Sequence, residues 1–276
     1  MSDEKIRFNI KAHNKVAGTY EGHHTQIFNP IEQNRIREHL SHAMSLVNTS
    51  GEAKRALDFG CGTGNVTAHM VSLGLSVTAA DVAEAFLRKV EKRFAGNPAV
   101  RTARINGTDL RAFPDGAFDL AAAYAVLHHI PDYLPIVREL IRVTRPGGVI
   151  MIDREAAACF WKPTPLYREF AELTAGLAAA QRGKPSWTRF LKWETYVNRW
   201  KIGNNPRYQP EGDIHIWEDD HIEWGAIRET FASHGCEIVW EREYLGFDGG
   251  CPLEVYERYK DRCADDMVLI ARKRAP

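Results

Sequence analysis

The sequence has no hydrophobic run long enough to cross a membrane. Its longest uninterrupted apolar stretch, residues 120–127, is eight residues long, whereas a membrane-spanning helix needs roughly 20 apolar residues. The first ten residues, MSDEKIRFNI, also lack the basic segment followed by an apolar segment that marks a secretory signal. We therefore expect no membrane association and a cytoplasmic location.

The sequence has few cysteines and no net charge. The five cysteines are scattered and odd in number, which argues against a disulfide framework and favours free thiols in a reducing compartment. The 36 lysine and arginine residues are balanced by 36 aspartate and glutamate residues. The chain thus lacks the cationic excess that draws proteins to nucleic acids, and no nucleic-acid partner is expected.

The chain has no fixed-period repeat and no low-complexity tract, and its order lies in an alternation of apolar segments. Five segments are strand-like, and the stretches between them are helix-like. The strand-like segments are residues 55–59, 76–80, 100–105, 118–124 and 148–152, and the helix-like ones are 65–73, 83–94 and 134–143. This alternation predicts a doubly wound α/β fold, a mostly parallel sheet with helices on both faces.

The alternation stops after residue 153. Residues 154–212 form a long segment that we interpret as an insertion or lid, and the pattern resumes with a helix at 220–234 and two strands, 237–244 and 267–273. Asp220 is the predicted N-cap of that helix, because Glu223 follows three residues later, and Gly235 comes just past its end.

Three alternate glycines mark a candidate ligand-binding loop. In the segment LDFGCGTGN, residues 57–65, a buried strand runs through Gly60, Gly62 and Gly64 into a helix. Glycine allows a tight turn and a close approach of backbone to ligand, and the helix N-terminus offers unpaired N–H groups. The alternatives are an ordinary strand-to-helix turn or a nicotinamide site, but the dinucleotide motif spaces its glycines as GxGxxG, and this loop reads GxGxG.

Two acidic residues follow the next two strands. Asp81 ends the strand-like segment at 76–80, and Asp109 follows the segment at 100–105. Open α/β sheets bind ligands at the carboxyl ends of their strands, where Asp81 could accept hydrogen bonds from a ribose and Asp109 from an exocyclic amine. Asp81 could equally cap the helix at 83–94. Together with the glycine loop, the two acids predict a nucleoside pocket.

Four blocks in this order and spacing make the chain resemble the class I S-adenosylmethionine-dependent methyltransferases. They are LDFGCGTGN (57–65), VTAADV (77–82), NGTDLRAFPDGAFDLAAAYAVLHHIPD (106–132) and LIRVTRPGGVIMID (140–153). The resemblance implies a Rossmann-like seven-stranded sheet with an antiparallel C-terminal strand and an α-helical insertion. It also implies S-adenosylmethionine as cofactor and S-adenosylhomocysteine as product.

The resemblance assigns the cofactor-binding residues one by one. Gly60, Gly62 and Gly64, with Cys61 between them, would line the methionine end of the cofactor. Asp81, followed by Val82, would bind the ribose, and Asp109 with Leu110 would hold the adenine. Ala125 would lie beside the sulfonium, and Tyr20 in an N-terminal segment would close over the cofactor. Asp58 would organise the loop, or serve only a local hydrogen-bonding role.

Histidine is the natural candidate for a general base, if the acceptor needs one. His128 and His129 follow the fourth strand, and His23 is a third candidate for catalysis; His24 is a candidate for substrate binding. His128 and His129 are adjacent, so we expect their side chains to point apart. In the family the second of these histidines occurs irrespective of substrate, which favours a structural role for His129. No histidine pair at helical spacing flanks a third ligand, so no metal site is predicted.

The insertion should select the acceptor. Six of the seven tryptophans lie between residues 161 and 224, and Trp193 and Trp200 recur at helical spacing. Such a stripe either packs against the core or a second subunit, or forms a substrate wall. The predicted organisation is therefore an N-terminal helical cover at 1–50, a cofactor-binding core at 51–153, a substrate-binding insertion at 154–212 and completion of the sheet at 213–276. Homo-oligomers could form through the N-terminal or insertion helices.

The leading hypothesis is methyl transfer to a small, partly aromatic or apolar molecule, at oxygen or carbon rather than nitrogen. The alternatives are a protein or nucleic-acid acceptor and a nicotinamide-binding oxidoreductase. Base-amine methyltransferases of this fold carry an Asn/Asp-Pro-Pro-aromatic block after the fourth strand. Here that position is occupied by residues 124–127, YAVL.

Overall fold

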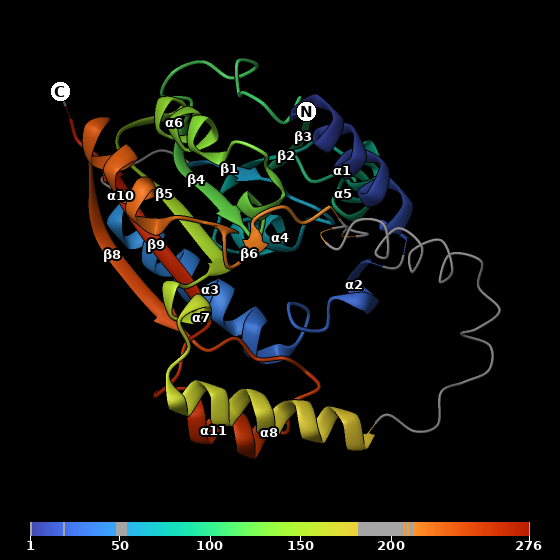
Figure 1. The fold of residues 1–276 in the computed structure, drawn as a ribbon. Helices are drawn as coiled ribbons and strands as arrows, with labels where there is room; N and C mark the ends of the chain where they lie inside the picture. The colour runs from blue at the N-terminus through green and yellow to red at the C-terminus, as the bar shows by residue number, and fades with distance from the viewer. Residues whose placement is uncertain are drawn as a thin grey trace.

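The computed structural model describes residues 2–18, 20–47, 54–181, 207, 209 and 212–275. A seven-stranded sheet forms its centre (Figure 1). In spatial order the strands are β3 (Val100–Arg104), β2 (Ser76–Asp81), β1 (Arg55–Phe59), β4 (Phe118–Tyr124), β5 (Thr144–Ala156), β9 (Asp266–Lys273) and β8 (Cys236–Tyr244). The first five strands in this order, from β3 through β2, β1 and β4 to β5, are parallel to one another. Strand β9 runs antiparallel to both its neighbours. The predicted fold class is confirmed.

Helices cover both faces of the sheet. On one face α3 (Pro30–Leu46) and α4 (Asn65–Ser72) bury Ile36, Leu40 and Met70. On the other, α6 (Tyr133–Val143) and α10 (Trp224–Ser233) bury Ile136 and Phe231. The amphipathic spacing of these residues places one apolar stripe of each helix against the strands. Helix α5 (Glu84–Arg93) packs on β2 and β3.

The remaining elements lie around the sheet. Helices α1 (Ser2–Val16) and α2 (Tyr20–His23) precede α3, and the short 3-10 helix η1 (Leu127–His129) follows β4. After β5 come α7 (Ala158–Trp161) and α8 (Pro165–Gln181), and α8 lies alongside α11 (Leu253–Tyr259) in Figure 1, with Phe170 against Tyr259. A two-stranded ribbon, β6 (Ile216–Trp217) with β7 (Asp220–His221), precedes α10. No helix in the described ranges is long and apolar enough to span a membrane.

The structure corrects the predicted start of the helix at 220–234. Helix α10 begins at Trp224 with Glu223 at the N-cap, and Asp220 belongs to β7 instead. The Asp220 carboxylate is bonded to His215 Nδ1 at 2.5 Å, and the Glu223 N–H donates to the Tyr133 hydroxyl at 2.9 Å. Asp220 is thus engaged elsewhere, and a side chain from α6 satisfies the helix start.

Strand β5 continues three residues beyond the predicted boundary at 153. A bulge between Asp153 and Glu155 lets the strand keep pairing with β9 through Ala156. Arg154, within the bulge, has a left-handed φ of 63°, which is uncommon for a side chain of this size. The bulge keeps both acidic neighbours buried while it turns Arg154 toward α3 and β9.

Arg154 is the centre of a buried ion-pair network. Its Nη1 lies 3.1 Å from Glu32 Oε2 and 2.8 Å from Asp266 Oδ2. Glu32, from α3, also accepts bonds from Arg35 Nη1 at 2.9 Å and from the Phe247 N–H at 2.6 Å. One carboxylate therefore joins α3, the end of β5 and the chain after β8.

Removing that carboxylate should destabilise the fold strongly. We expect Glu32→Ala to lower the free energy of unfolding by about 3–5 kcal/mol, because Arg154 and Arg35 lose a shared buried partner. The matched control is Glu84→Ala, which removes an exposed pair with Arg88 and should cost less than about 1 kcal/mol. Urea denaturation of both variants measures the difference, and equal losses would contradict a central role for Glu32.

Candidate active site

The glycine loop is held against the neighbouring strand β2. The N–H groups of Gly60 and Cys61 donate to the Ala80 carbonyl at 2.8 and 3.0 Å. Gly60, Gly62 and Gly64 all have left-handed φ values, of 71°, 50° and 84°. These are conformations that glycine adopts without strain, so the alternate spacing of glycines is what allows the backbone to turn from β1 into α4.

Asp81 lies at the carboxyl end of β2, where it joins the loop to the next helix. Its Oδ2 accepts from the Gly62 N–H at 2.9 Å and its Oδ1 from the Ala83 N–H at 2.8 Å. Burial raises the pKa of Asp81 to about 6, although these hydrogen bonds oppose the shift. Asp58, beneath the loop, accepts from the Thr67 hydroxyl at 2.5 Å, and burial raises its pKa to about 7.

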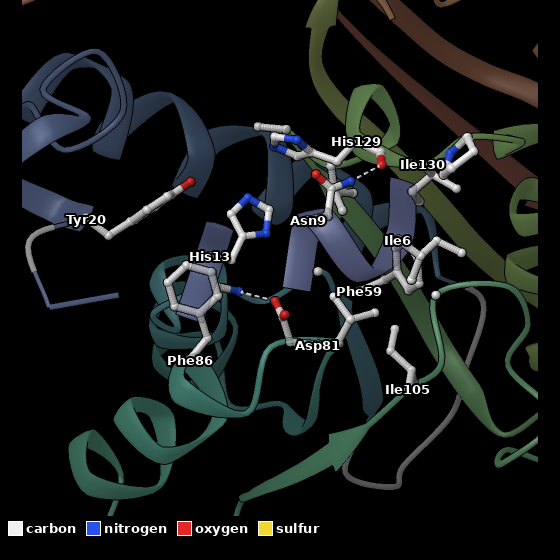
Figure 2. A pocket seen from close by; sticks show the side chains of 17 residues that line it. Ile6, Asn9, His13, Tyr20, Phe59, Asp81, Phe86, Ile105, His129 and Ile130 are labelled. Carbon is white, nitrogen blue, oxygen red and sulfur yellow. Dashed lines mark hydrogen bonds between the residues drawn. The ribbon is translucent and has the colours of Figure 1, made fainter. Parts of the chain in front are cut away.

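A pocket opens at this edge of the sheet, between the strand ends and helix α1 (Figure 2). Gly60 and Gly62 from the loop, Asp81 and Val82 after β2, and Ala125 after β4 contribute to one wall. The enclosed space is about 80 Å³, whereas small-molecule pockets commonly measure about 300–1,000 Å³. The pocket in this structure is thus smaller than a typical small-molecule site.

Helix α1 supplies three lining residues that sequence analysis missed, namely Ile6, Asn9 and His13. They recur at intervals of three and four, so helical spacing was the signal that could have placed them on one face. Asn9 Nδ2 donates to the His129 carbonyl at 2.6 Å, as Figure 2 shows. The Ala85 N–H donates to Asn14 Oδ1 at 2.9 Å. Two polar contacts thus fasten α1 across the pocket.

Seven of the residues named from sequence line this pocket: Tyr20, Gly60, Gly62, Asp81, Val82, Ala125 and His129. Tyr20 stacks on His24 at a ring distance of 4.0 Å and meets Phe86 at 5.2 Å, but His24 itself does not line the pocket. The side chain of His23, and both Trp193 and Trp200, lie outside the residues described.

Other predicted cofactor residues lie behind the wall. Cys61 packs with Ala79 and Leu87, and burial raises its pKa well above the usual value. A Cβ on Gly64 would meet Val90 and Phe94, so this glycine faces helix α5. Asp58 is buried beneath the loop, where it bonds Thr67.

The two residues predicted to hold the adenine, Asp109 and Leu110, do not line this pocket. Asp109 Oδ1 accepts from the Arg111 N–H at 3.1 Å, and the Leu110 N–H donates to Glu139 Oε2 at 2.7 Å. Neither residue lines the pocket, whereas Ile105 and Gly107 do. The chain turns away from the pocket at Gly107, whose φ is 81°, and this turn places Asp109 elsewhere.

The side chains of His128 and His129 were expected to point apart, but they lie side by side, with ring centroids 4.2 Å from each other. His128 Nδ1 lies 2.8 Å from Glu155 Oε2. Burial would lower the pKa of His128, but Glu155 raises it above the ordinary value. For His129, burial lowers the pKa well below the ordinary value, and His128 and His13 add to this effect.

Glu155 is a further residue that sequence analysis missed. Its Oε1 accepts from the N–H groups of Val126 and Leu127 at 2.9 and 2.7 Å, at the start of η1. Because Glu155 follows the expected end of β5, only the bulge in that strand brings it under the loop after β4. It sets the course of the chain through Ala125, whose φ is 51°.

Solved structures of the same fold include several methyltransferases. A methyltransferase from Methanosarcina mazei aligns with a TM-score of 0.51 at 21% identity, covering 82% of this chain and 95% of that one. A methyltransferase solved with the Haloferax volcanii Trm112 activator aligns at 0.56 and 13%, covering 95% and 98%. The [4+2]-cyclase SpnF also aligns, at 0.51 and 17%, covering 87% and 82%. The shared architecture is the Rossmann-like methyltransferase fold, which does not fix the reaction.

Sequence comparisons match the central part of the chain to a known domain. Residues 57–152 match the family model described as a methyltransferase domain. A demethylmenaquinone methyltransferase from Clavibacter sepedonicus is 33% identical over 44% of this chain and 47% of its own length. A ubiquinone biosynthesis O-methyltransferase from Pseudomonas aeruginosa is 30% identical over 45% and 50%. The chain thus spans about half the length of these relatives. The match thus places a methyltransferase domain at residues 57–152 of the chain.

Gly60 should tolerate a side chain less well than Gly62. A Cβ on Gly60 would lie 2.3 Å from Val126 Cγ2, whereas one on Gly62 would meet nothing within 4 Å. We expect Gly60→Ala to cost about 2–4 kcal/mol of stability, from overpacking added to left-handed strain. Gly62→Ala, which adds strain alone, should cost about 1–2 kcal/mol. Urea denaturation compares the two, and equal losses would show that Val126 does not confine Gly60.

Proposed function

We propose that this chain transfers a methyl group from S-adenosylmethionine to an oxygen or carbon atom of a small, partly apolar molecule. The observation that supports the proposal best is the pocket at the carboxyl ends of β1, β2 and β4, where the glycine loop and Asp81 meet. The match of residues 57–152 to a methyltransferase domain covers this wall of the pocket. The names of the relatives, which include quinone-pathway methyltransferases, favour a small-molecule acceptor.

The residues of the pocket fit the proposed cofactor. Asp81 is 6% exposed and presents a carboxylate to which ribose hydroxyls can donate. Val82, Ile105 and Phe86 provide apolar surface suited to the faces of an adenine ring. When bound, S-adenosylmethionine supplies a methyl group that is already activated by its sulfonium. The chain then has chiefly to orient the acceptor and exclude water.

Helix α1 is proposed to perform both of those tasks. In Figure 2 His13 lies between Phe86, Tyr20 and His129, and its ring centroid is 4.9 Å from that of His129. An imidazole there can accept a proton from an acceptor hydroxyl, so we add His13 to the candidates His23, His128 and His129. Ile6 and Asn9 cover the same space from above. An acceptor reaching the pocket beneath this helix has to be small, which disfavours proteins and nucleic acids.

The assignment of Asp81 predicts a pH dependence of cofactor binding. Ribose hydroxyls donate to the carboxylate, so protonation through the raised pKa of about 6 should weaken binding as the pH falls. We expect the Kd for S-adenosylhomocysteine to be about tenfold higher at pH 5 than at pH 7. Asp81→Asn should weaken binding by about 1–3 kcal/mol at pH 7 and flatten the profile.

Calorimetric titration from pH 5 to 8 measures this profile. Asp109→Asn is the matched control, because it removes the other predicted nucleoside acid, which lies away from the pocket, and should leave the Kd unchanged. A wild-type profile without a change near pH 6 would remove Asp81 from the ribose site. A loss of affinity in the Asp109 variant would restore the original prediction.

The reaction itself is tested with methyl-labelled S-adenosylmethionine and a panel of small quinols, phenols, amines and peptides. We expect label in a quinol or phenol, and none in peptides. Deleting residues 1–18 should abolish turnover while residues 54–181 still fold, because the cover over the pocket is lost. Circular dichroism checks folding. Labelled peptide as the main product would contradict the proposed acceptor class, and undiminished turnover after deletion would contradict the role of α1.

A further inference from the structure

Three potential metal ligands converge beside the pocket. His128 and His129, from η1, and Asp213, from the segment before β6, each offer one ligand atom, and these atoms lie within 4.8 Å of one another. His129 Nδ1 is 3.2 Å from Asp213 Oδ1. Two imidazoles and one carboxylate form a donor set that suits a divalent transition-metal ion such as Zn²⁺, Co²⁺ or Ni²⁺.

The first histidine is already oriented in the manner of a metal ligand. Glu155 Oε2 lies 2.8 Å from His128 Nδ1, which leaves the Nε2 atom of the ring for an ion. A carboxylate on the far nitrogen is the usual support of a metal-bound histidine, because it fixes the tautomer and the ring plane. Glu155 is itself rigid, since Val126 and Leu127 donate to its other oxygen.

The second histidine, His129, has a buried Nδ1 atom close to the Asp213 carboxylate. His129 Nδ1 has no hydrogen-bond partner within the described part of the chain, even though the Asp213 carboxylate is near. A buried polar atom without a partner is costly, and an ion bound at this nitrogen would satisfy it.

Main-chain bonds hold the backbone that follows Asp213. The N–H groups of Ile214 and His215 both donate to the His128 carbonyl, at 2.8 and 3.2 Å. His215 Nε2 lies 2.9 Å from the Ile130 carbonyl. The backbone next to Asp213 is therefore bonded to the same turn that carries the two histidines. Ligands of a tetrahedral ion with bonds of about 2.0–2.2 Å lie about 3.3 Å apart, a spacing that side-chain rotation can reach from here.

We propose that His128, His129 and Asp213 bind one divalent transition-metal ion, with Glu155 as the positioning residue. The absence of a third ligand near His128 and His129 in the sequence is what led to the expectation of no metal. Three protein ligands leave a further coordination position for water or a ligand oxygen. His129 also lines the pocket. The molecule assigned to this open position is therefore a hydroxyl-bearing acceptor, an assignment that rests on the proposed function.

The experiment titrates tag-free, chelator-treated protein with Co²⁺ and Zn²⁺. Calorimetry gives the affinity, and the visible absorption of Co²⁺ reports nitrogen ligation and coordination number. We expect saturable one-to-one binding that Asp213→Asn and His128→Gln each weaken at least tenfold. Glu155→Gln should weaken it about 10- to 100-fold. The control His234→Asn, at an exposed histidine after α10, should bind as the wild type does.

Two results would overturn the proposal: no saturable binding by the wild type, or unchanged binding by the Asp213→Asn variant. Thermal unfolding of each variant shows whether it folds. If the His128 or Glu155 variant does not, Asp213→Asn decides, because its side chain is partly exposed and the change preserves its shape. The titration contains neither cofactor nor acceptor. Failure of metal binding would thus leave the methyltransferase assignment standing, and failure of methyl transfer would leave the metal site standing.

Discussion

The hydrogen bonds of one buried carboxylate, Glu155, determine the arrangement of the site. They join the end of β5 to the chain after β4. The position of the turn that follows β4 is therefore fixed relative to β5. Ala125, just after β4, and Arg154, within the bulge of β5, have left-handed φ values, a backbone cost that persists only where surrounding contacts impose it. The turn beyond Ala125 carries both histidines, and Arg154 on the other side reaches Glu32 in α3.

Asp81 fixes the glycine loop in a similar way, through hydrogen bonds from backbone N–H groups to a buried carboxylate. Without a ligand its carboxylate satisfies two backbone N–H groups, one on each side of the pocket edge. Burial disfavours its charge and the backbone bonds favour it, so its protonation is balanced near the physiological range. Under the proposed function, ribose hydroxyls would meet a carboxylate that is already held in place, which limits the cost of ordering that side chain on binding.

The N-terminal helix makes the pocket a closed one. Ile6, Asn9 and His13 complete a wall that the sheet leaves open, and contacts with the His129 carbonyl and the start of α5 hold the helix there. The same fold carries diverse reactions, so an element added at its open edge is where a particular acceptor can be selected. The proposed function gives α1 part of the selecting role that sequence analysis gave to the insertion.

The sequence by itself determined the sheet, the order of its elements and the cofactor-facing loop. These features depend on local patterns, since strand periodicity, alternate glycines and the acid after β2 are all read within a few residues of one another. It could not show that Asp109 lies outside the lining of this pocket, because the course of the chain after β3 is not a local pattern. Nor could it find His13, Glu155 or Asp213 beside His129. Those residues are distant in sequence, and only the bulge in β5, the docking of α1 and the bonds from Ile214 to the His128 carbonyl bring them together.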